Sequence, residues 1–183
     1  MSKRNKPEIL NTTGIAKSRL FTIEAVDLRF SNGNEARYER IVAPGHGAVM
    51  TIPLITPSQV LMIREYSVGS DRYELVFPKG VIDPGETALE AANRELMEEV
   101  GYGSRQLREL KTVSIAPGYL NFKTTFVLAR DLYPKRLQGD EPEQMEVVTI
   151  DLDEVPALLA GDELTEARSI AGLLMLSSGG IPA

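Results

Sequence analysis

Residues 80–102 read GVIDPGETALEAANRELMEEVGY, and this stretch decides the fold of the chain. Residues 83–85, Asp-Pro-Gly, are typical of a turn. Thr87 is a favourable helix N-cap, and Glu90, three residues later, completes a capping box. The stretch therefore predicts a loop that leads into a helix over about residues 88–100.

The predicted helix has two different faces. Its apolar residues recur at helical spacing and should face the core: Leu89, Ala92, Leu96 and Val100. Glu95, Glu98 and Glu99 form a second cluster at spacing i, i+3 and i+4, where like charges repel one another. A hard divalent cation removes this repulsion because it binds carboxylate oxygens. The cluster therefore predicts a metal site, and Arg94 is placed to pair with Glu98.

A solvated acidic helix face is the alternative explanation of a bare Glu-x-x-Glu-Glu. The complete pattern is larger, because it fixes residues of the loop and of the helix: Gly80, Glu86, Arg94, Glu95, Glu98, Glu99 and Gly101, with Leu96 and Tyr102 at apolar positions. At average residue usage a chance match is on the order of one in ten million. The pattern is similar to the Nudix box, G-x5-E-x7-R-E-U-x-E-E-x-G-U, where U is apolar. Tyr102 occupies the last U, where an aliphatic residue is more usual.

This resemblance implies a Nudix hydrolase, which cleaves a nucleoside diphosphate linked to another moiety with the help of Mg²⁺, or of Mn²⁺ or another divalent metal. It implies metal ligation by Glu95, Glu98 and Glu99, with Glu98 also catalytic and Glu86 an additional ligand. The backbone carbonyl of Lys79 is expected to contact the metal as well. Here residues 76–80, Val-Phe-Pro-Lys-Gly, replace the usual Pro-Ala-Gly, so this contact departs from the family pattern.

Composition limits the classes of partner. The chain has 183 residues, enough for a sizeable core, and a net charge of −6, which argues against a nucleic-acid groove. It has no cysteine, which excludes disulfides and cysteine-bound zinc. It has neither an apolar signal core at its start nor a segment long enough to span a membrane. We expect a cytoplasmic protein with a small-molecule substrate and no nucleic-acid or membrane partner.

Alternation of apolar residues and turn signals predict an α+β fold. Strands are expected at about residues 20–30, 36–42, 48–55, 59–66, 73–77, 108–116, 124–129 and 145–151. Helices are expected at 153–160 and 164–177, the latter with Ala167, Ile170, Ala171 and Leu174 on one face. The sequence Ser31-Asn32-Gly33-Asn34 predicts a hairpin between the first two strands.

The resemblance implies an α/β/α sandwich with a mixed sheet, formed by residues 46–183 as the Nudix hydrolase domain. Residues 1–45 are then an additional N-terminal antiparallel sheet. In similar ADP-sugar hydrolases this element packs on, or swaps with, a second subunit. A homodimer is therefore expected.

Substrate choice must come from residues outside the box. Pro117 resembles the signature of ADP-ribose pyrophosphatases, and Tyr119 resembles that of diadenosine-polyphosphate hydrolases and is suited to stacking on adenine. Both also fit an ordinary turn. Arg64 is a possible phosphate contact through its planar guanidinium.

Several segments along the chain resemble the ADP-compounds hydrolases of the NudE subfamily: residues 18–21, 63–66, 80–103, 131–134 and 139–143. This resemblance implies ADP-ribose, diadenosine triphosphate and NADH as substrates, with AMP and a phosphorylated compound as products. It also places the general base on Glu141, with Glu143 as the second choice. The alternatives are another nucleotide sugar such as GDP-mannose, or a Nudix nucleotide-binding module without catalysis.

Overall fold

The protein is represented by a computed structural model that describes residues 5–43 and 45–177. Its first sheet is antiparallel and three-stranded, in the order β1 (Glu8–Lys17), β2 (Thr22–Arg29), β3 (Glu35–Val42). β2 and β3 are the predicted hairpin. β1 was not predicted, because all ten of its residues are exposed and its sequence therefore has no buried apolar alternation.

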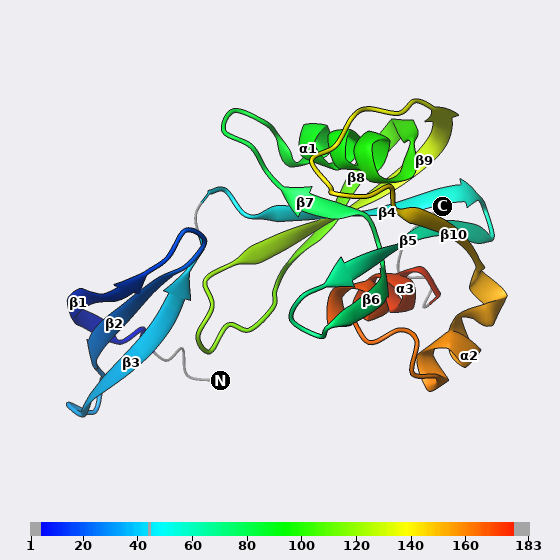
Figure 1. The fold of residues 1–183 in the computed structure, drawn as a ribbon. Helices are drawn as coiled ribbons and strands as arrows, with labels where there is room; N and C mark the ends of the chain where they lie inside the picture. The colour runs from blue at the N-terminus through cyan, green and yellow to red at the C-terminus, as the bar shows by residue number, and fades with distance from the viewer. Residues whose placement is uncertain (1–4, 44, 178–183) are drawn as a thin grey trace.

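The second sheet has seven strands and follows the linker to the N-terminal sheet (Figure 1). Its strands are β4 (Ala48–Thr56), β5 (Gln59–Ser67), β6 (Arg72–Val76), β7 (Lys79–Val81), β8 (Tyr102–Ser114), β9 (Lys123–Pro134) and β10 (Glu146–Asp151). The order is β10-β5-β4-β9-β8, with β6 beside β5 and β7 beside β4. β4 and β9 are parallel, whereas the other pairs are antiparallel, so the mixed sheet is confirmed.

Helices cover both faces of this sheet (Figure 1). They are α1 (Ala88–Glu95), which continues as a π-helix over Leu96–Val100, α2 (Val155–Ala160) after a 3₁₀ turn over Leu152–Glu154, and α3 (Ala167–Ser177). Val49 of β4 packs on the α1 side, and Met50, the next residue, packs on the α3 side with Leu173. Burial of both faces explains the unbroken apolar run of β4. Among the described residues, no helix is both long and apolar enough to cross a membrane.

The apolar face predicted for the last helix is only partly buried, because Ile170 and Ala171 pack against the core whereas Leu174 does not. Leu174 is 48% exposed, and the buried residues of α3 are Ser169, Gly172 and Leu173. The Ser169 hydroxyl accepts a hydrogen bond of 3.0 Å from the Phe77 amide. A Cβ on Gly172 would lie 3.0 Å from the Phe77 ring, so the missing side chain allows the helix to approach the sheet closely. The fully buried residues of α3 include a serine and a glycine, which apolar spacing alone does not indicate.

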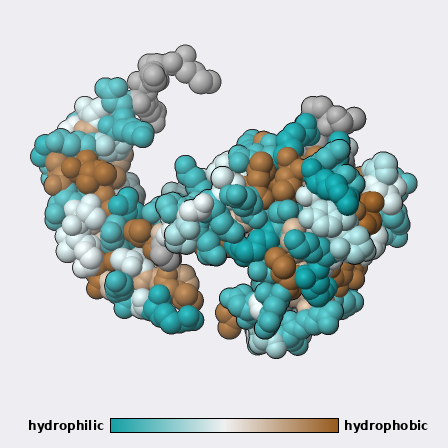
Figure 2. Space-filling view, turned by 90° about the horizontal axis from the view of Figure 1, so that it is seen from above, coloured by the Kyte–Doolittle hydropathy of each residue, from teal (hydrophilic) through white to brown (hydrophobic). Residues whose placement is uncertain are grey.

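The N-terminal sheet stands apart from the larger sheet (Figures 1 and 2). The described contact between them is made by β3 and by the loop between β8 and β9. The Ile41 amide donates to the Tyr119 carbonyl at 2.7 Å, and the Asn121 amide donates to the Ile41 carbonyl at 3.3 Å. The Ala43 amide donates to the Asn121 side chain at 3.0 Å.

Candidate active site

The helix begins at Ala88 as the sequence predicts, whereas residues 79–81, expected to open the loop, form the short strand β7. The Thr87 hydroxyl accepts a hydrogen bond from the Glu90 amide at 3.2 Å, and the Glu90 carboxylate accepts one from the Thr87 amide at 2.8 Å. This capping box satisfies backbone donors at the start of α1. Gly101 ends the helical segment with a φ of 84°, in the left-handed region that glycine tolerates.

The last turn of this segment is wider than predicted, because Leu96–Val100 is a π-helix rather than a continuation of α1. The Gly101 amide donates to the Leu96 carbonyl at 3.2 Å, which closes the wider turn. Single π turns are frequent at functional sites, where they change the direction of side chains. Here the π turn contains both Glu98 and Glu99.

Three carboxylates meet beside this turn. Oxygen atoms of Glu95, Glu99 and Glu141 lie within 4.8 Å of one another. Glu95 and Glu99 are only 7% and 4% exposed. The Lys79 amide donates to Glu99 at 2.9 Å, which places the backbone of β7 against the cluster. Gly80 lies directly against Glu95, since a Cβ at position 80 would be 1.9 Å from a Glu95 oxygen.

Burial dominates the electrostatics of the cluster. It raises the pKa of Glu99 to about 9, against the opposing effect of Lys79 and with a further rise from Glu95 and Glu65. Burial also raises the pKa of Glu95, partly offset by Arg94. Arg94 and Lys79 thus offset only part of the effect of burial. Grouped carboxylate oxygens whose charge is only partly compensated fit a divalent cation such as Mg²⁺.

Arg94 connects the glutamates of the box that surround this cluster. Its guanidinium donates to both carboxylate oxygens of Glu86, at 2.8 and 3.0 Å, to Glu95 at 2.7 Å and to Glu98 at 3.0 Å. These hydrogen bonds raise the pKa of Arg94, and the Glu86–Arg94 bonds lower the pKa of Glu86. Glu86 thus lies in the ion-pair network and outside the group of three carboxylates that are arranged around one point.

A pocket of about 680 Å³ lies between this cluster and the loop that joins β9 to β10. It is lined by Glu65, Lys79, Gly80, Val81, Asp83, Arg94, Glu95, Glu98, Glu99 and residues 138–142. The Lys79 side chain forms an ion pair with Glu65 at one wall. The pocket therefore contains all the glutamates of the helix cluster together with Glu141, as the sequence analysis expects.

Glu143 and Arg64 line a neighbouring pocket, and Glu143 also lines a cavity of about 320 Å³ together with Glu98, Glu99 and Glu141. The Tyr73 hydroxyl donates to Glu143 at 2.5 Å. The Arg64 guanidinium forms ion pairs with Glu146, at 3.5 Å, and with Glu163. Arg64 and Glu143 are thus close in sequence to residues that line the acidic pocket. Their charged groups, however, bind Glu146, Glu163 and Tyr73.

Pro117 and Tyr119 lie far from the carboxylates in the fold, on the groove between the β8–β9 loop and the N-terminal sheet. Tyr119 is 59% exposed there. Their neighbours in the groove include Val26, Leu28 and Tyr38. Within the described residues of one chain, the two predicted substrate contacts and the acidic pocket do not share a cavity.

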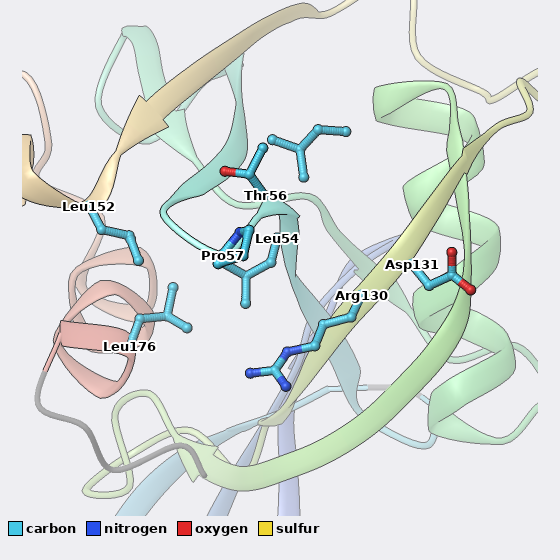
Figure 3. Close-up of a pocket in the computed structure, with 8 residues that line it drawn as sticks. Leu54, Thr56, Pro57, Arg130, Asp131, Leu152 and Leu176 are labelled. Atoms are coloured by element: carbon cyan, nitrogen blue, oxygen red, sulfur yellow. The ribbon is translucent and has the colours of Figure 1, made fainter. Parts of the chain in front are cut away.

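A second cavity, of about 540 Å³, is mostly apolar and lies near the end of α3 (Figure 3). Leu54, Leu152 and Leu176 point into it, and Arg130 reaches toward it from β9. None of the predicted site residues lines this cavity. Its lining lacks the group of carboxylates that distinguishes the acidic pocket.

Sequence reasoning missed three residues that shape the acidic pocket. The Lys79 side chain and Glu65 pair across its wall, and Arg136 donates to the Glu98 and Val100 carbonyls at 3.1 and 3.2 Å. Lys79 departs from the usual Pro-Ala-Gly at this position, and that departure was the available signal. Arg136 had no signal, because its partners are backbone carbonyls and its role depends on the path of the loop.

Comparison with known proteins agrees with this geometry. Residues 7–40 match the model of the NudE-type Nudix hydrolase N-terminal domain, and residues 45–171 match that of the NUDIX domain. The chain is 49% identical to the ADP compounds hydrolase NudE of Escherichia coli (strain K12), over 96% of this chain and 95% of that protein. It is 26% identical to an ADP-ribose pyrophosphatase of Bacillus subtilis (strain 168), over 85% and 86% of the two chains.

Among solved structures, a crystal structure of an ADP compounds hydrolase superposes with a TM-score of 0.88 at 46% identity. The match covers 97% of this chain and 96% of that one, so it includes the N-terminal sheet as well as the larger domain. The complete box, the grouped carboxylates and these matches lead to one conclusion: the chain belongs to the Nudix hydrolase family, in its NudE-type subfamily.

Proposed function

We propose that this chain hydrolyses the pyrophosphate bond of ADP-linked compounds and releases AMP and a phosphorylated product. The observation that carries this proposal is the meeting of Glu95, Glu99 and Glu141 within 4.8 Å in one pocket. The 49% identity to an ADP compounds hydrolase over almost the whole chain supports the ADP moiety. Candidate substrates are ADP-ribose, diadenosine triphosphate and NADH.

We infer that Glu95, Glu98 and Glu99 hold Mg²⁺, with Mn²⁺ as a substitute. When bound, the metal would neutralise the diphosphate and lower the pKa of a water. Arg94 holds the carboxylates of Glu95 and Glu98 through its two hydrogen bonds. The Lys79 amide orients Glu99. The Lys79 carbonyl remains a predicted metal ligand. Glu86 accepts hydrogen bonds from Arg94 through both carboxylate oxygens, so its proposed role is to hold that arginine in place.

Glu141 is the proposed general base. A base must lie within hydrogen-bond reach of the water whose proton it removes. Glu141 is half-buried and faces Glu95 and Glu99 across the pocket, whereas Glu143 is exposed and accepts a hydrogen bond from Tyr73. This difference favours Glu141 over Glu143. Arg64, Pro117 and Tyr119 remain proposed contacts for parts of the substrate that extend away from the diphosphate.

A turnover assay with a panel of substrates tests the substrate class. ADP-ribose, diadenosine triphosphate, NADH and GDP-mannose would be incubated with magnesium and, separately, with a chelator, and the products identified. We expect AMP from the three ADP compounds and no turnover in the chelator. Faster hydrolysis of GDP-mannose than of all three would replace the ADP proposal with the nucleotide-sugar alternative.

Glu99→Gln tests the assignment of the metal site. The amide keeps the size of the side chain but removes the charge that a metal requires. We expect turnover of ADP-ribose to be abolished, while circular dichroism and thermal unfolding show an intact fold. Turnover near the wild-type rate would show that the metal site is assigned to the wrong residues. Loss of turnover would also contradict a binding module without catalysis.

We also propose that residues 1–45 mediate a homodimer. Large apolar residues of this region are exposed in the single chain: Ile9, Leu10, Ile15, Leu20, Phe21 and Tyr38. A small sheet with this much exposed apolar surface is a plausible protein interface. Pro117 and Tyr119 border the same region.

A further inference from the structure

The loop between β9 and β10 carries Glu141 and is firmly attached at its start. Its first three residues bond to the end of the helical segment. The Lys135 amide donates to the Gly101 carbonyl at 3.0 Å, and the Leu137 amide donates to the Met97 carbonyl at 3.1 Å. Arg136 adds two bonds to carbonyls of the π turn. This attachment ends before Gln138, three residues ahead of Glu141.

The rest of the loop makes one described hydrogen bond. Among the described residues, the hydrogen bond from the Tyr73 hydroxyl to the Glu143 carboxylate, at 2.5 Å, is the one made by residues 138–144. Tyr73 lies on β6, opposite Tyr66 of β5. The two rings meet edge to face, with centroids 5.6 Å apart. The Tyr66 hydroxyl donates to Asp71 at 2.6 Å and makes no described bond to the loop.

We propose that Tyr73 is a positioning residue for the hydrolytic reaction, because its hydroxyl holds Glu143 and so keeps Glu141 facing Glu95 and Glu99. The proposal rests on the proposed function. Pro142 separates the two glutamates, and its ring restricts the backbone between them. A restraint on Glu143 therefore also limits the positions that Glu141 can adopt. Glu143 is then an anchor of the loop rather than a second base.

The size of the effect follows from the strength of one hydrogen bond. Without it, residues 138–144 lose their described hydrogen bond and are held only at their two ends, by Leu137 and by Met145 and β10, so Glu141 spends less time in its productive position. A single hydrogen bond changes such a population by about threefold to tenfold. Tyr73→Phe should therefore lower kcat for ADP-ribose by about this factor. The KM should change little, because Tyr73 itself does not line the acidic pocket.

Tyr66→Phe is the matched control. It removes a hydroxyl that bonds to Asp71 and keeps the ring that packs on Tyr73. We expect Tyr66→Phe to retain the wild-type kcat, and both variants to unfold near the wild-type temperature. Limited proteolysis with a glutamate-specific protease should cleave after Glu143 faster in Tyr73→Phe than in Tyr66→Phe. Equal kcat in Tyr73→Phe and the wild type would overturn the proposal, as would an equal loss in both variants.

Two substitutions at Glu143 distinguish its role as an anchor of the loop from a role as the general base. The amide oxygen in Glu143→Gln still accepts the Tyr73 hydroxyl, whereas Glu143→Ala leaves no acceptor. An anchor predicts near wild-type kcat for Glu143→Gln and a threefold to tenfold loss for Glu143→Ala. The double variant Tyr73→Phe/Glu143→Ala should lose no more than either single variant, because both remove the same bond.

A loss of about a hundredfold or more in Glu143→Gln would instead identify Glu143 as the base and overturn the positioning role. Additive losses in the double variant would also overturn it. Failure of the proposed function is recognised separately, because the wild type would then release no AMP from the ADP compounds of the substrate panel. If Glu99→Gln is inactive and Tyr73→Phe is fully active, only the positioning role is wrong.

Discussion

Gly80 shows how one missing side chain defines the acidic pocket. A Cβ at this position would overlap the Glu95 carboxylate, at 1.9 Å from its nearest oxygen. Glu95 cannot move freely, because it is buried and bonded to Arg94. We expect Gly80→Ala to displace Glu95 and to weaken magnesium binding at least about tenfold, as loss of support for a metal ligand typically does. Titration of activity with magnesium measures this change.

Gly69→Ala is the matched control for this prediction. Position 69 has no atom within 4 Å of an added Cβ, and its backbone is not in the left-handed region. The control should bind magnesium as the wild type does. If Gly80→Ala keeps the wild-type magnesium dependence, then either Glu95 relaxes without cost or it does not bind the metal.

At the scale of residues, the sequence predicted what a linear pattern can encode. The spacing of Glu95, Glu98 and Glu99 depends on one helical segment, so their common pocket could be foreseen, although Glu98 lies outside the group formed by Glu95, Glu99 and Glu141. Glu141 was foreseen by resemblance to the family, and the fold brings it to the same point. Lys79 with Glu65, and Tyr73 with Glu143, are pairs from separate strands and loops. No local periodicity encodes such pairs, which is why they required the structure.

The helix that carries the glutamates depends on its capping box. Thr87→Ala removes the hydroxyl that accepts from the Glu90 amide, and it leaves this amide at the exposed start of the helix without its side-chain partner. Loss of such a cap costs about 1 kcal/mol. In a chain of this size the unfolding temperature should fall by about 2–4 °C. Thermal unfolding of wild type and Thr87→Ala in the presence of a chelator measures the difference.

A second variant, Thr87→Ser, distinguishes loss of the N-cap hydrogen bond from a general effect of substitution on the loop. Thr87→Ser keeps a hydroxyl at the N-cap and should restore most of the stability. If Thr87→Ala and Thr87→Ser unfold at the same temperature, the hydrogen bond of the cap contributes nothing measurable. Activity at saturating magnesium should remain close to that of the wild type in both variants, since the glutamates lie in the later turns of the helical segment.

Elements with strong local signals were predicted well, and the others were not. The capping box and Gly101 define both ends of the helical segment, and β4 is recognisable from its apolar run. β1 is exposed along its whole length, and β7 has only three residues, so neither has a local pattern. The π turn differs from an α-helix by one hydrogen-bond register, a difference that residue spacing does not reveal.

Stability of the whole molecule should depend on pH through the buried carboxylates. The pKa of Glu99 is raised to about 9 in the folded protein, above its ordinary value of 4.5. Between these values the folded state retains a proton that the unfolded state releases, so the free energy of unfolding falls as pH rises. In a chelator we expect this fall between about pH 5 and pH 8.5, with a slope of at most about 1.4 kcal/mol per pH unit for one proton.

Denaturant unfolding at several pH values measures this slope. Saturating magnesium should reduce it, because the metal favours the ionised carboxylates of the folded state. Glu99→Gln should also reduce it, because the amide does not titrate. Stability that rises with pH in the chelator would contradict the burial of an uncompensated carboxylate. A slope unchanged in Glu99→Gln would assign the effect to another group, of which Glu95 is the first candidate.

The two sheets of the molecule differ in how well a single chain can bury them. The larger sheet is covered by α1 and α3, whereas the N-terminal sheet buries Ala25 and Val26 and leaves large apolar side chains in solvent. A three-stranded sheet needs a packed apolar face for stability. A second copy of the chain would supply one, and a stable dimer interface buries roughly 1,200–2,000 Å². We therefore expect the intact chain of 20.1 kDa to sediment at twice this mass.

Point variants test the interface without removing the sheet. Ile15 and Phe21 are 49% and 55% exposed in the single chain, so Ile15→Ser and Phe21→Ser should leave its fold intact. If these residues lie in the interface, the double variant should sediment as a monomer, as should a chain that lacks residues 1–45. The matched control is Val68→Ser, which changes an apolar residue that is 87% exposed outside the N-terminal sheet. An intact chain that is monomeric at micromolar concentration would exclude the dimer, and the exposed apolar surface would then require a different partner.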